Sequence, residues 1–284
     1  MSAGLGTVQR RTLCMSSLAA LMLPAGSADA ASSGDAQAAA RDELGGASGR
    51  LRAAINLGNP ILARRGAAPG APEGVSVDLA REAARRLGLG LELVEFEAAG
   101  KVVEAATAGQ VDMAFVAIDP VRGAGLDYTA PYVVIEGAYL VRADSPLQRN
   151  EDVDRAGTRV VVGRGSAYDL FLTRELHEAS LVRAPTSPAV TDLFLADRLD
   201  VAAGVKQQLE ADVRRLAATS APALRLLPGR FMVIEQAVAV PKGRRAAQAW
   251  LHTFVEEMKA SGFVAESLRR HAVEGAAVAP PASG

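Results

Sequence analysis

An arginine stands where a buried strand is expected to end. The apolar run VDMAFVAI, residues 111–118, predicts a buried strand, and Arg122 follows it in the turn of IDPVRGAGLDYTAPY. Open α/β sheets bind ligands at the carboxyl ends of their strands, and a guanidinium offers two parallel donors that match a carboxylate. We therefore interpret Arg122 as the residue that binds a ligand carboxylate. The alternative is a surface arginine on a turn, paired with Asp119 or Asp127.

A second candidate for anion binding lies in the segment GRGSAYD, residues 163–169. Gly165 lets the backbone approach a ligand closely, and Ser166 is expected to begin a helix whose free N–H groups favour an anion. An ordinary helix cap, which needs no ligand, is the alternative. Arg122 follows the expected strand 111–118 and Ser166 follows the expected strand 158–163. An anion bound by both residues would bridge the ends of these two strands.

Strands and helices alternate along the chain in two series. The expected strands are residues 51–57, 89–96, 111–118, 133–141, 158–163, 181–184, 199–205, 223–227 and 231–240. The expected helices are residues 76–87, 101–108, 166–178, 207–218, 244–259 and 263–271, with another that begins at Ser187. This alternation predicts parallel-rich α/β sheets that are covered on both faces.

A break after the fourth expected strand and a later returning strand divide these elements between two lobes. We assign residues 50–140 and 238–272 to lobe 1 and residues 141–237 to lobe 2, with hinges near 138–141 and 236–240. Two lobes joined by two crossings can rotate about the crossings, so the cleft between them is the expected binding site.

The N-terminus has the pattern of an export signal. Arg10 and Arg11 precede a short apolar stretch, residues 13–23, and Ala28-Asp29-Ala30 fits the small-x-small rule for cleavage after Ala30. Residues 1–30 are therefore predicted to be a signal peptide, exported by the general or the twin-arginine route, and the protein is expected in the periplasm. A buried N-terminal helix is the alternative. Residues 31–49 are predicted to be a flexible leader and residues 273–284 a disordered tail.

Composition excludes several classes of function. A formal net charge of -1 and 4% aromatic residues give no basis for nucleic-acid binding. Cys14, the single cysteine, lies in the predicted signal, so disulfides, thiolate nucleophiles and zinc–thiolate sites are not expected. His177, His252 and His271 fall in predicted helices and receive no catalytic or metal role. We expect a monomer without a membrane span, a metal or a cofactor.

These motifs together resemble the family 3 extracellular solute-binding proteins, the amino-acid-binding class that serves ABC importers. The resemblance covers about residues 50–271. It rests on GVSVDLAREAARRLGLGLELVEF, AGQVDMAFVAIDPVRGAGLDYTAPYVV, VVVGRGSAYD and the segment Leu199-Asp200-Val201. It implies a two-lobed periplasmic-binding-protein type II fold, a small-molecule solute and a permease partner in the inner membrane. It also implies that Arg122 binds the α-carboxylate of the ligand, with Gly165 and Ser166 adding backbone and hydroxyl donors.

The sequence departs from the family where an α-ammonium group would bind. Val205 stands where the family usually has an aspartate, and valine cannot give a cation a charge-assisted hydrogen bond. The other family ligand positions are held here by Asn56, Asn59, Leu62, Ala99, Phe115 and Ala117. Asp119 or Glu235 could replace the missing carboxylate. We therefore expect a small carboxylate or other organic anion without an α-amino group, and the alternative is an unusual amino-acid site.

Two further functions fit the same fold. Periplasmic cyclohexadienyl dehydratases need a general acid in the cleft, and the carboxylates placed for it by the sequence are Glu97, Asp119, Glu136 and Glu235. Other family members accompany periplasmic dehydrogenases and transport no solute. Each of these carboxylates also suits a solvated or capping position, so we expect a binding protein and not an enzyme.

Overall fold

The computed structural model describes residues 1, 3–4, 27–66 and 70–282 of the chain. The predicted signal peptide, residues 1–30, therefore lies almost entirely outside the described residues. Within the described part, no helix is long and apolar enough to cross a membrane.

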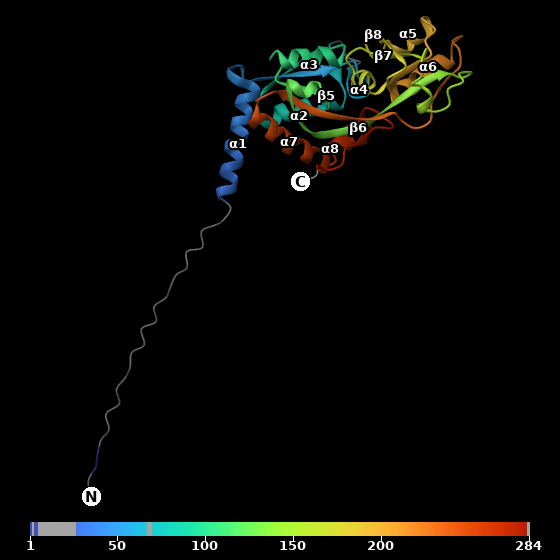
Figure 1. The fold of residues 1–284 in the computed structure, drawn as a ribbon. Coiled ribbons are helices and arrows are strands. Elements are labelled where there is room, and N and C mark those ends of the chain that lie inside the picture. The colour runs from blue at the N-terminus through green and yellow to red at the C-terminus, as the bar shows by residue number, and fades with distance from the viewer. Residues whose placement is uncertain (2, 5–26, 67–69, 283–284) are drawn as a thin grey trace.

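One ten-stranded sheet runs through the whole body of the molecule (Figure 1). Its strands lie in the order β4 (Gly90–Phe96), β1 (Arg50–Asn56), β5 (Met113–Ala117), β11 (Met232–Pro241), β6 (Leu126–Arg142), β9 (Val201–Val205), β7 (Arg159–Gly163) and β8 (Ser180–Ala184). Two short strands, β10 (Leu224–Leu226) and β12 (Ala277–Val278), also pair with β6, and β2 (Arg64–Arg65) pairs with β3 (Pro72–Glu73) in a separate hairpin. β1, β4 and β5 are parallel, as are β7, β8 and β9.

The helices cover the faces of the two halves of this sheet. They are α1 (Ser27–Gly45), α2 (Val75–Leu87), α3 (Ala99–Thr107), α4 (Ala167–Glu175), α5 (Val190–Ala196), α6 (Lys206–Ala217), α7 (Arg245–Ala260) and α8 (Phe263–Arg270). Three short 3-10 turns lie at Gly46–Ser48, Arg122–Ala124 and Asn150–Asp152. The two-lobed α/β fold predicted from the sequence is therefore confirmed.

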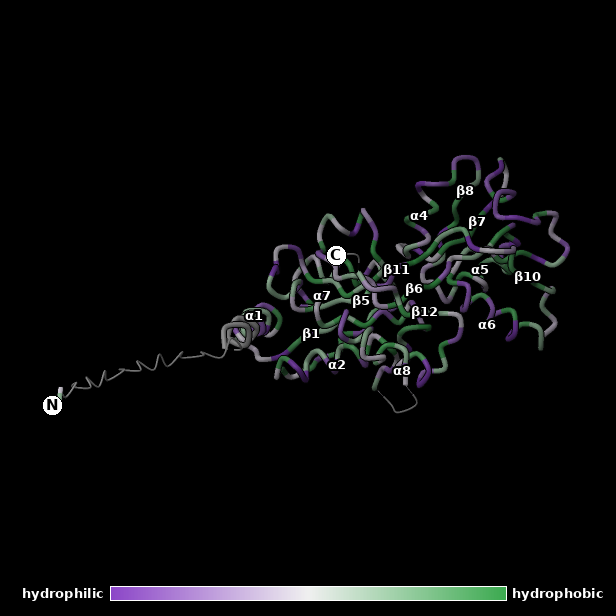
Figure 2. Tube along the Cα trace, turned by 90° about the horizontal axis from the view of Figure 1, so that it is seen from below, coloured by the Kyte–Doolittle hydropathy of each residue, from purple (hydrophilic) through white to green (hydrophobic). Residues whose placement is uncertain are grey.

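The two lobes are joined by β6 and β11, which lie between them in Figure 2. Val238 of β11 pairs with Phe115 in lobe 1, whereas Leu140 of β6 pairs with Ala202 in lobe 2. The predicted hinges at 138–141 and 236–240 thus fall inside the two lobes. The register places the crossing a few residues earlier in each strand, near residues 133–137 and 232–236.

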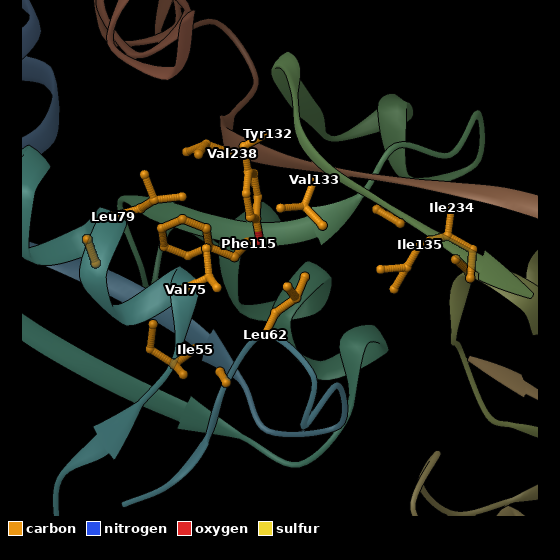
Figure 3. Close-up of a cluster of buried hydrophobic side chains, with 14 of the residues drawn as sticks. Ile55, Leu62, Val75, Leu79, Phe115, Tyr132, Val133, Ile135, Ile234 and Val238 are labelled. Atoms are coloured by element: carbon orange, nitrogen blue, oxygen red, sulfur yellow. The ribbon is translucent and has the colours of Figure 1, made fainter. Parts of the chain in front are cut away.

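A cluster of buried side chains fixes the strand ends of lobe 1 (Figure 3). The rings of Phe115 and Tyr132 meet edge to face, with centroids 6.0 Å apart, and the Tyr132 hydroxyl lies 3.1 Å from the Ser76 hydroxyl. Ile135 and Ile234 continue the cluster along the two crossing strands. Because β5 is buried along its whole length, the turn that carries Arg122 leaves a rigid strand.

The expected flexible leader, residues 31–49, is wrong for most of its length. Helix α1 continues to Gly45 and contacts α7 at the outer edge of lobe 1 (Figure 1). Ala40 and Leu44 are 0% and 1% exposed, so the alanine-rich segment buries apolar side chains. The Glu43 carboxylate also accepts a hydrogen bond of 2.8 Å from the backbone N–H of Ala247 in the first turn of α7. Burial against lobe 1 explains why the segment is helical, and the Glu43 cap on α7 holds it in place.

The expected disordered tail, residues 273–284, is also wrong where the structure describes it, over residues 273–282. Ala277 and Val278 form β12, which pairs with Val134 and Val133 of β6 beside the crossing. The backbone N–H of Ala279 then donates to the carbonyl of Tyr132 at 3.1 Å. The exposed backbone edge of β6 offers this segment hydrogen bonds that its composition could not show.

Candidate functional site

A small cavity lies between the lobes at the carboxyl ends of their strands. Its volume is about 30 Å³, which leaves room for about two water molecules. It is lined by Asn56, Gly58, Asn59, Ala99, Ala117, Arg122, Ser166, Ala167, Tyr168, Ser187, Val205, Ile234 and Gln236. Five of the seven predicted ligand-binding residues line it, namely Asn56, Ala117, Arg122, Ser166 and Val205. Of these five, Arg122 and Ser166 were located from a strand end and a helix start, and Asn56, Ala117 and Val205 from the family resemblance.

Arg122 is the charged residue of this wall, and it is only 4% exposed. Its Nη1 donates to the carbonyl of Ala117 at 3.0 Å, and its Nη2 donates across the cleft to the carbonyl of Gly165 at 2.8 Å. Burial lowers the pKa of Arg122, but a guanidinium stays protonated in proteins. In the described part of the chain no carboxylate forms an ion pair with it, so pairing with Asp119 or Asp127 is not what the structure shows.

The loop after β7 offers Arg122 a backbone carbonyl, and not the backbone N–H that was expected to bind the ligand. Gly165 has a φ of +68°, and a Cβ atom there would lie 3.2 Å from Cα of Gly100 in lobe 1. Its N–H donates to the Asp169 carboxylate at 2.8 Å, so this donor is not open to a ligand. Ser166 caps α4, because its Oγ accepts from the N–H of Asp169 at 3.0 Å. The expected donation from Gly165 is therefore replaced by its carbonyl, which accepts from Arg122.

Asp119 does not line the cavity, although the sequence suggested it as a ligand residue. One carboxylate oxygen accepts from the N–H of Val121 at 2.8 Å, and the other pairs with Arg174 of α4 at 3.1 Å. Asp119 belongs to lobe 1 and Arg174 to lobe 2, so the pair spans the cleft. Nothing local in the sequence marks Arg174, because its partner lies 55 residues away on another lobe.

Arg174→Ala is expected to weaken ligand binding by about 1 kcal/mol, roughly fivefold in Kd, because it removes an interlobe contact of the closed form. The Asp119 carboxylate is 4% exposed and would lose its charged partner. Calorimetric titration with an acid that binds the parent protein measures the change in Kd. Added salt should reduce the difference between the parent and the variant. The control is Arg155→Ala, which breaks the Asp152 pair within lobe 2. Equal affinities of the two variants would show that the Asp119 pair does not assist closure.

The position of Val205 agrees with the departure seen in the sequence. Val205 ends β9 and lines the cavity, while the next residue, Lys206, pairs with Glu136 at 3.1 Å outside it. Asn56 uses its Oδ1 to accept the N–H of Gly58 at 3.0 Å, which holds the turn after β1. No aspartate or glutamate is among the described residues of the wall, so the site offers an ammonium group no carboxylate.

The wall also contains polar residues that were not among the seven predicted ligand-binding residues. Tyr168 and Ser187 come from lobe 2, and Gln236 comes from β11, where it pairs in register with Ala117 of β5. Asn59 is 9% exposed, and its Oδ1 has no hydrogen-bond partner within the described chain. Asn59 carried a signal, because it holds a family ligand position after the end of β1, whereas Gln236 lies inside β11 and carried none.

The carboxylates proposed for a dehydratase lie elsewhere. Glu97 pairs with Arg65 at 2.6 Å, and Glu136 is held between Lys206 and Arg230. Glu235 is exposed. None of these three glutamates, nor Asp119, is part of the cavity wall.

Residues 51–274 match the model of the bacterial extracellular solute-binding proteins, family 3. The chain belongs to this family. No curated protein matches the sequence.

Solved structures of several binding proteins share the fold. A mutant of ArgBP from T. maritima is 22% identical, with a TM-score of 0.70 over 83% of this chain and 100% of that one. A solute receptor for L-cysteine of Neisseria gonorrhoeae is 20% identical, with a TM-score of 0.71 over 84% and 94%. An ancestral amino acid-binding protein, a precursor of cyclohexadienyl dehydratase, is 20% identical, with a TM-score of 0.65 over 78% and 95%.

Proposed function

We propose that this chain is the periplasmic solute-binding protein of an ABC importer and that it captures a small carboxylate by closing its lobes. Arg122 of lobe 1 binds the carboxylate, and Ser166 of lobe 2 contacts it from the other side. The closed monomer then docks on the permease in the inner membrane. The ligand favours the closed form only by as much as it binds the closed form more tightly than the open form.

The observation that carries the proposal is the buried guanidinium of Arg122. It faces the interlobe cavity from the end of β5, and within the described chain it has backbone carbonyls but no carboxylate as partners. A buried charge is costly without a counter-charge, and a ligand carboxylate supplies one. The described residues of the cavity wall include no aspartate or glutamate, which favours an organic anion over an amino acid.

A thermal-shift screen of the purified protein tests this function. The compounds are α-amino acids, the matching acids without the amino group, the matching 2-oxo acids, and prephenate and arogenate. A ligand at a hundredfold excess over its Kd adds about 2.7 kcal/mol to the stability. Stabilisation by carboxylates is expected, whereas stabilisation by amino acids alone would restore the ordinary ligand class of the family.

The same compounds separate the two other functions. Turnover of prephenate or arogenate, followed in a separate assay, would indicate an enzyme, although no carboxylate or imidazole is among the described residues of the cavity wall to act as general acid. A protein that responds to none of these acids, and whose Arg122→Ala variant behaves like the parent, would instead be a partner protein of a dehydrogenase.

A further inference from the structure

The cavity wall has the charge of a site for a monoanion. Arg122 is the charged residue among the described residues that line it. Of the carboxylates around the cavity, Asp119 is paired with Arg174, Asp169 is paired with Arg183, and Asp212 lines an adjoining cavity of about 10 Å³. Asp212 is itself bonded to the Thr191 hydroxyl at 2.8 Å and to Arg215 at 3.1 Å. A zwitterion would therefore place its ammonium group beside a guanidinium with no free carboxylate to offset it.

The cavity wall contains a hydrogen-bond acceptor that a ligand carboxylate cannot satisfy. Asn59 is nine-tenths buried, and its Oδ1 accepts no hydrogen bond from the described chain. An unpaired buried acceptor is unfavourable, so the ligand should bring a donor to it. A carboxylate or an oxo group has none, whereas a hydroxyl has one donor and two lone pairs.

The position of Asn59 makes this contact compatible with Arg122. Asn59 follows the carboxyl end of β1, and Arg122 follows that of β5, which is the neighbouring strand in the sheet. Both side chains belong to lobe 1 and line the same cavity. Gln236, from the strand on the other side of β5, adds a second amide that is 6% exposed. The acidic end and the hydroxyl end of one small molecule can thus be bound by one lobe.

We infer that the solute is a small 2-hydroxy carboxylate, whose carboxylate binds Arg122 and whose hydroxyl donates to Asn59 Oδ1. This inference rests on the proposed function and names the class of its solute. The small size of the cavity, about 30 Å³ beside a neighbour of about 10 Å³, favours the smallest acids of this class. Asn59 is then the residue that determines specificity between hydroxy acids and their analogues.

The test is a calorimetric titration of the protein, expressed from the full-length sequence, with four matched pairs of acids. Glycolate and L-lactate are compared with acetate and propionate, with glyoxylate and pyruvate, and with glycine and L-alanine. The hydroxy acids are expected to bind on the order of tenfold or more tightly than the acids lacking the hydroxyl. Equal affinities for glycolate and acetate, or tighter binding of the oxo acids or amino acids, would overturn the inference. In the case of equal affinities the proposed carboxylate site would stand, whereas failure of all eight compounds would overturn both.

Two variants of Asn59 sharpen the assignment. Asn59→Ala should abolish the preference for hydroxy acids while acetate still binds, and Asn59→Asp should shift the preference toward glycine and L-alanine, because a carboxylate can offset an ammonium charge. The matched control is Asn150→Ala, since Asn150 Oδ1 is also buried without a partner in the described chain but lies outside the cavity wall. If Asn59→Ala still prefers hydroxy acids over acids without the hydroxyl, the role of Asn59 is overturned. This outcome holds even where Asn59→Ala is less stable than the parent.

Discussion

Arg122→Ala is expected to weaken the binding of a carboxylate solute by about 1.5–3 kcal/mol, roughly ten- to a hundredfold in Kd. The side chain is buried at the cavity and offers its guanidinium to a ligand carboxylate, where hydrogen bonds are assisted by both charges. The variant also loses the interlobe bond from Nη2 to the carbonyl of Gly165. Calorimetric titration with an acid that stabilises the parent protein measures the first effect, and small-angle scattering measures the degree of closure.

Two controls separate ligand recognition from folding. Arg122→Lys keeps the charge but loses the planar fork, so its affinity should fall between those of the parent and the alanine variant. Arg142→Ala removes another arginine that donates to backbone carbonyls, those of Leu199 and Phe194, but lies outside the cavity wall. If Arg142→Ala and Arg122→Ala reduce affinity equally, the loss comes from general destabilisation and the assignment of Arg122 is wrong.

The strand ends of the site were predictable because the relevant signals are local. A mostly apolar run ending in a turn locates Arg122, and a serine before a helical segment locates Ser166. Asn56, Ala117 and Val205 came from the family resemblance, and they lie at the carboxyl ends of β1, β5 and β9. The helix start at Ser76 was less accurate, because α2 begins at Val75 and the Ser76 hydroxyl meets Tyr132 inside the core.

The contacts that cross the cleft were not predictable in this way. The partner of Asp119 is 55 residues away, and nothing in either segment distinguishes Arg174 from other helix-surface arginines. The backbone of Gly165 is a partial exception. Asp169 follows Ser166 by three residues, which is the spacing of a residue that can reach back and occupy the N–H groups of a helix start. That acceptor left the Gly165 carbonyl, and not its N–H, available to the other lobe.

The two chain ends were misjudged because composition cannot show a tertiary partner. Alanine-rich and glycine-rich segments have few apolar side chains, so residues 31–49 and 273–284 read as disordered. Yet Ala40 and Leu44 have the spacing of one helix face, and lobe 1 provides a surface that buries them. The tail needs no apolar face of its own, since an unpaired strand edge supplies its hydrogen bonds.

Leu44→Ala tests whether α1 is part of lobe 1, and we expect it to lower the free energy of unfolding by about 2–5 kcal/mol. Leu44 is 1% exposed within the core of lobe 1, so its truncation leaves a cavity as well as lost apolar burial. A flexible leader would make the same substitution nearly neutral, because exposed leucines bury nothing. Urea denaturation of the parent and the variant, with equal slopes, gives the difference directly.

The control for this substitution is Asp42→Ala on the exposed side of the same helix, which should change stability by less than about 0.5 kcal/mol. Solute affinity should be unchanged in Leu44→Ala wherever the protein remains folded, because α1 lies at the outer edge of lobe 1 and contributes no residue to the cavity wall. A variant as stable as the parent would restore the flexible leader. A variant that loses stability but keeps its affinity would show that the segment before the family match is a structural part of lobe 1.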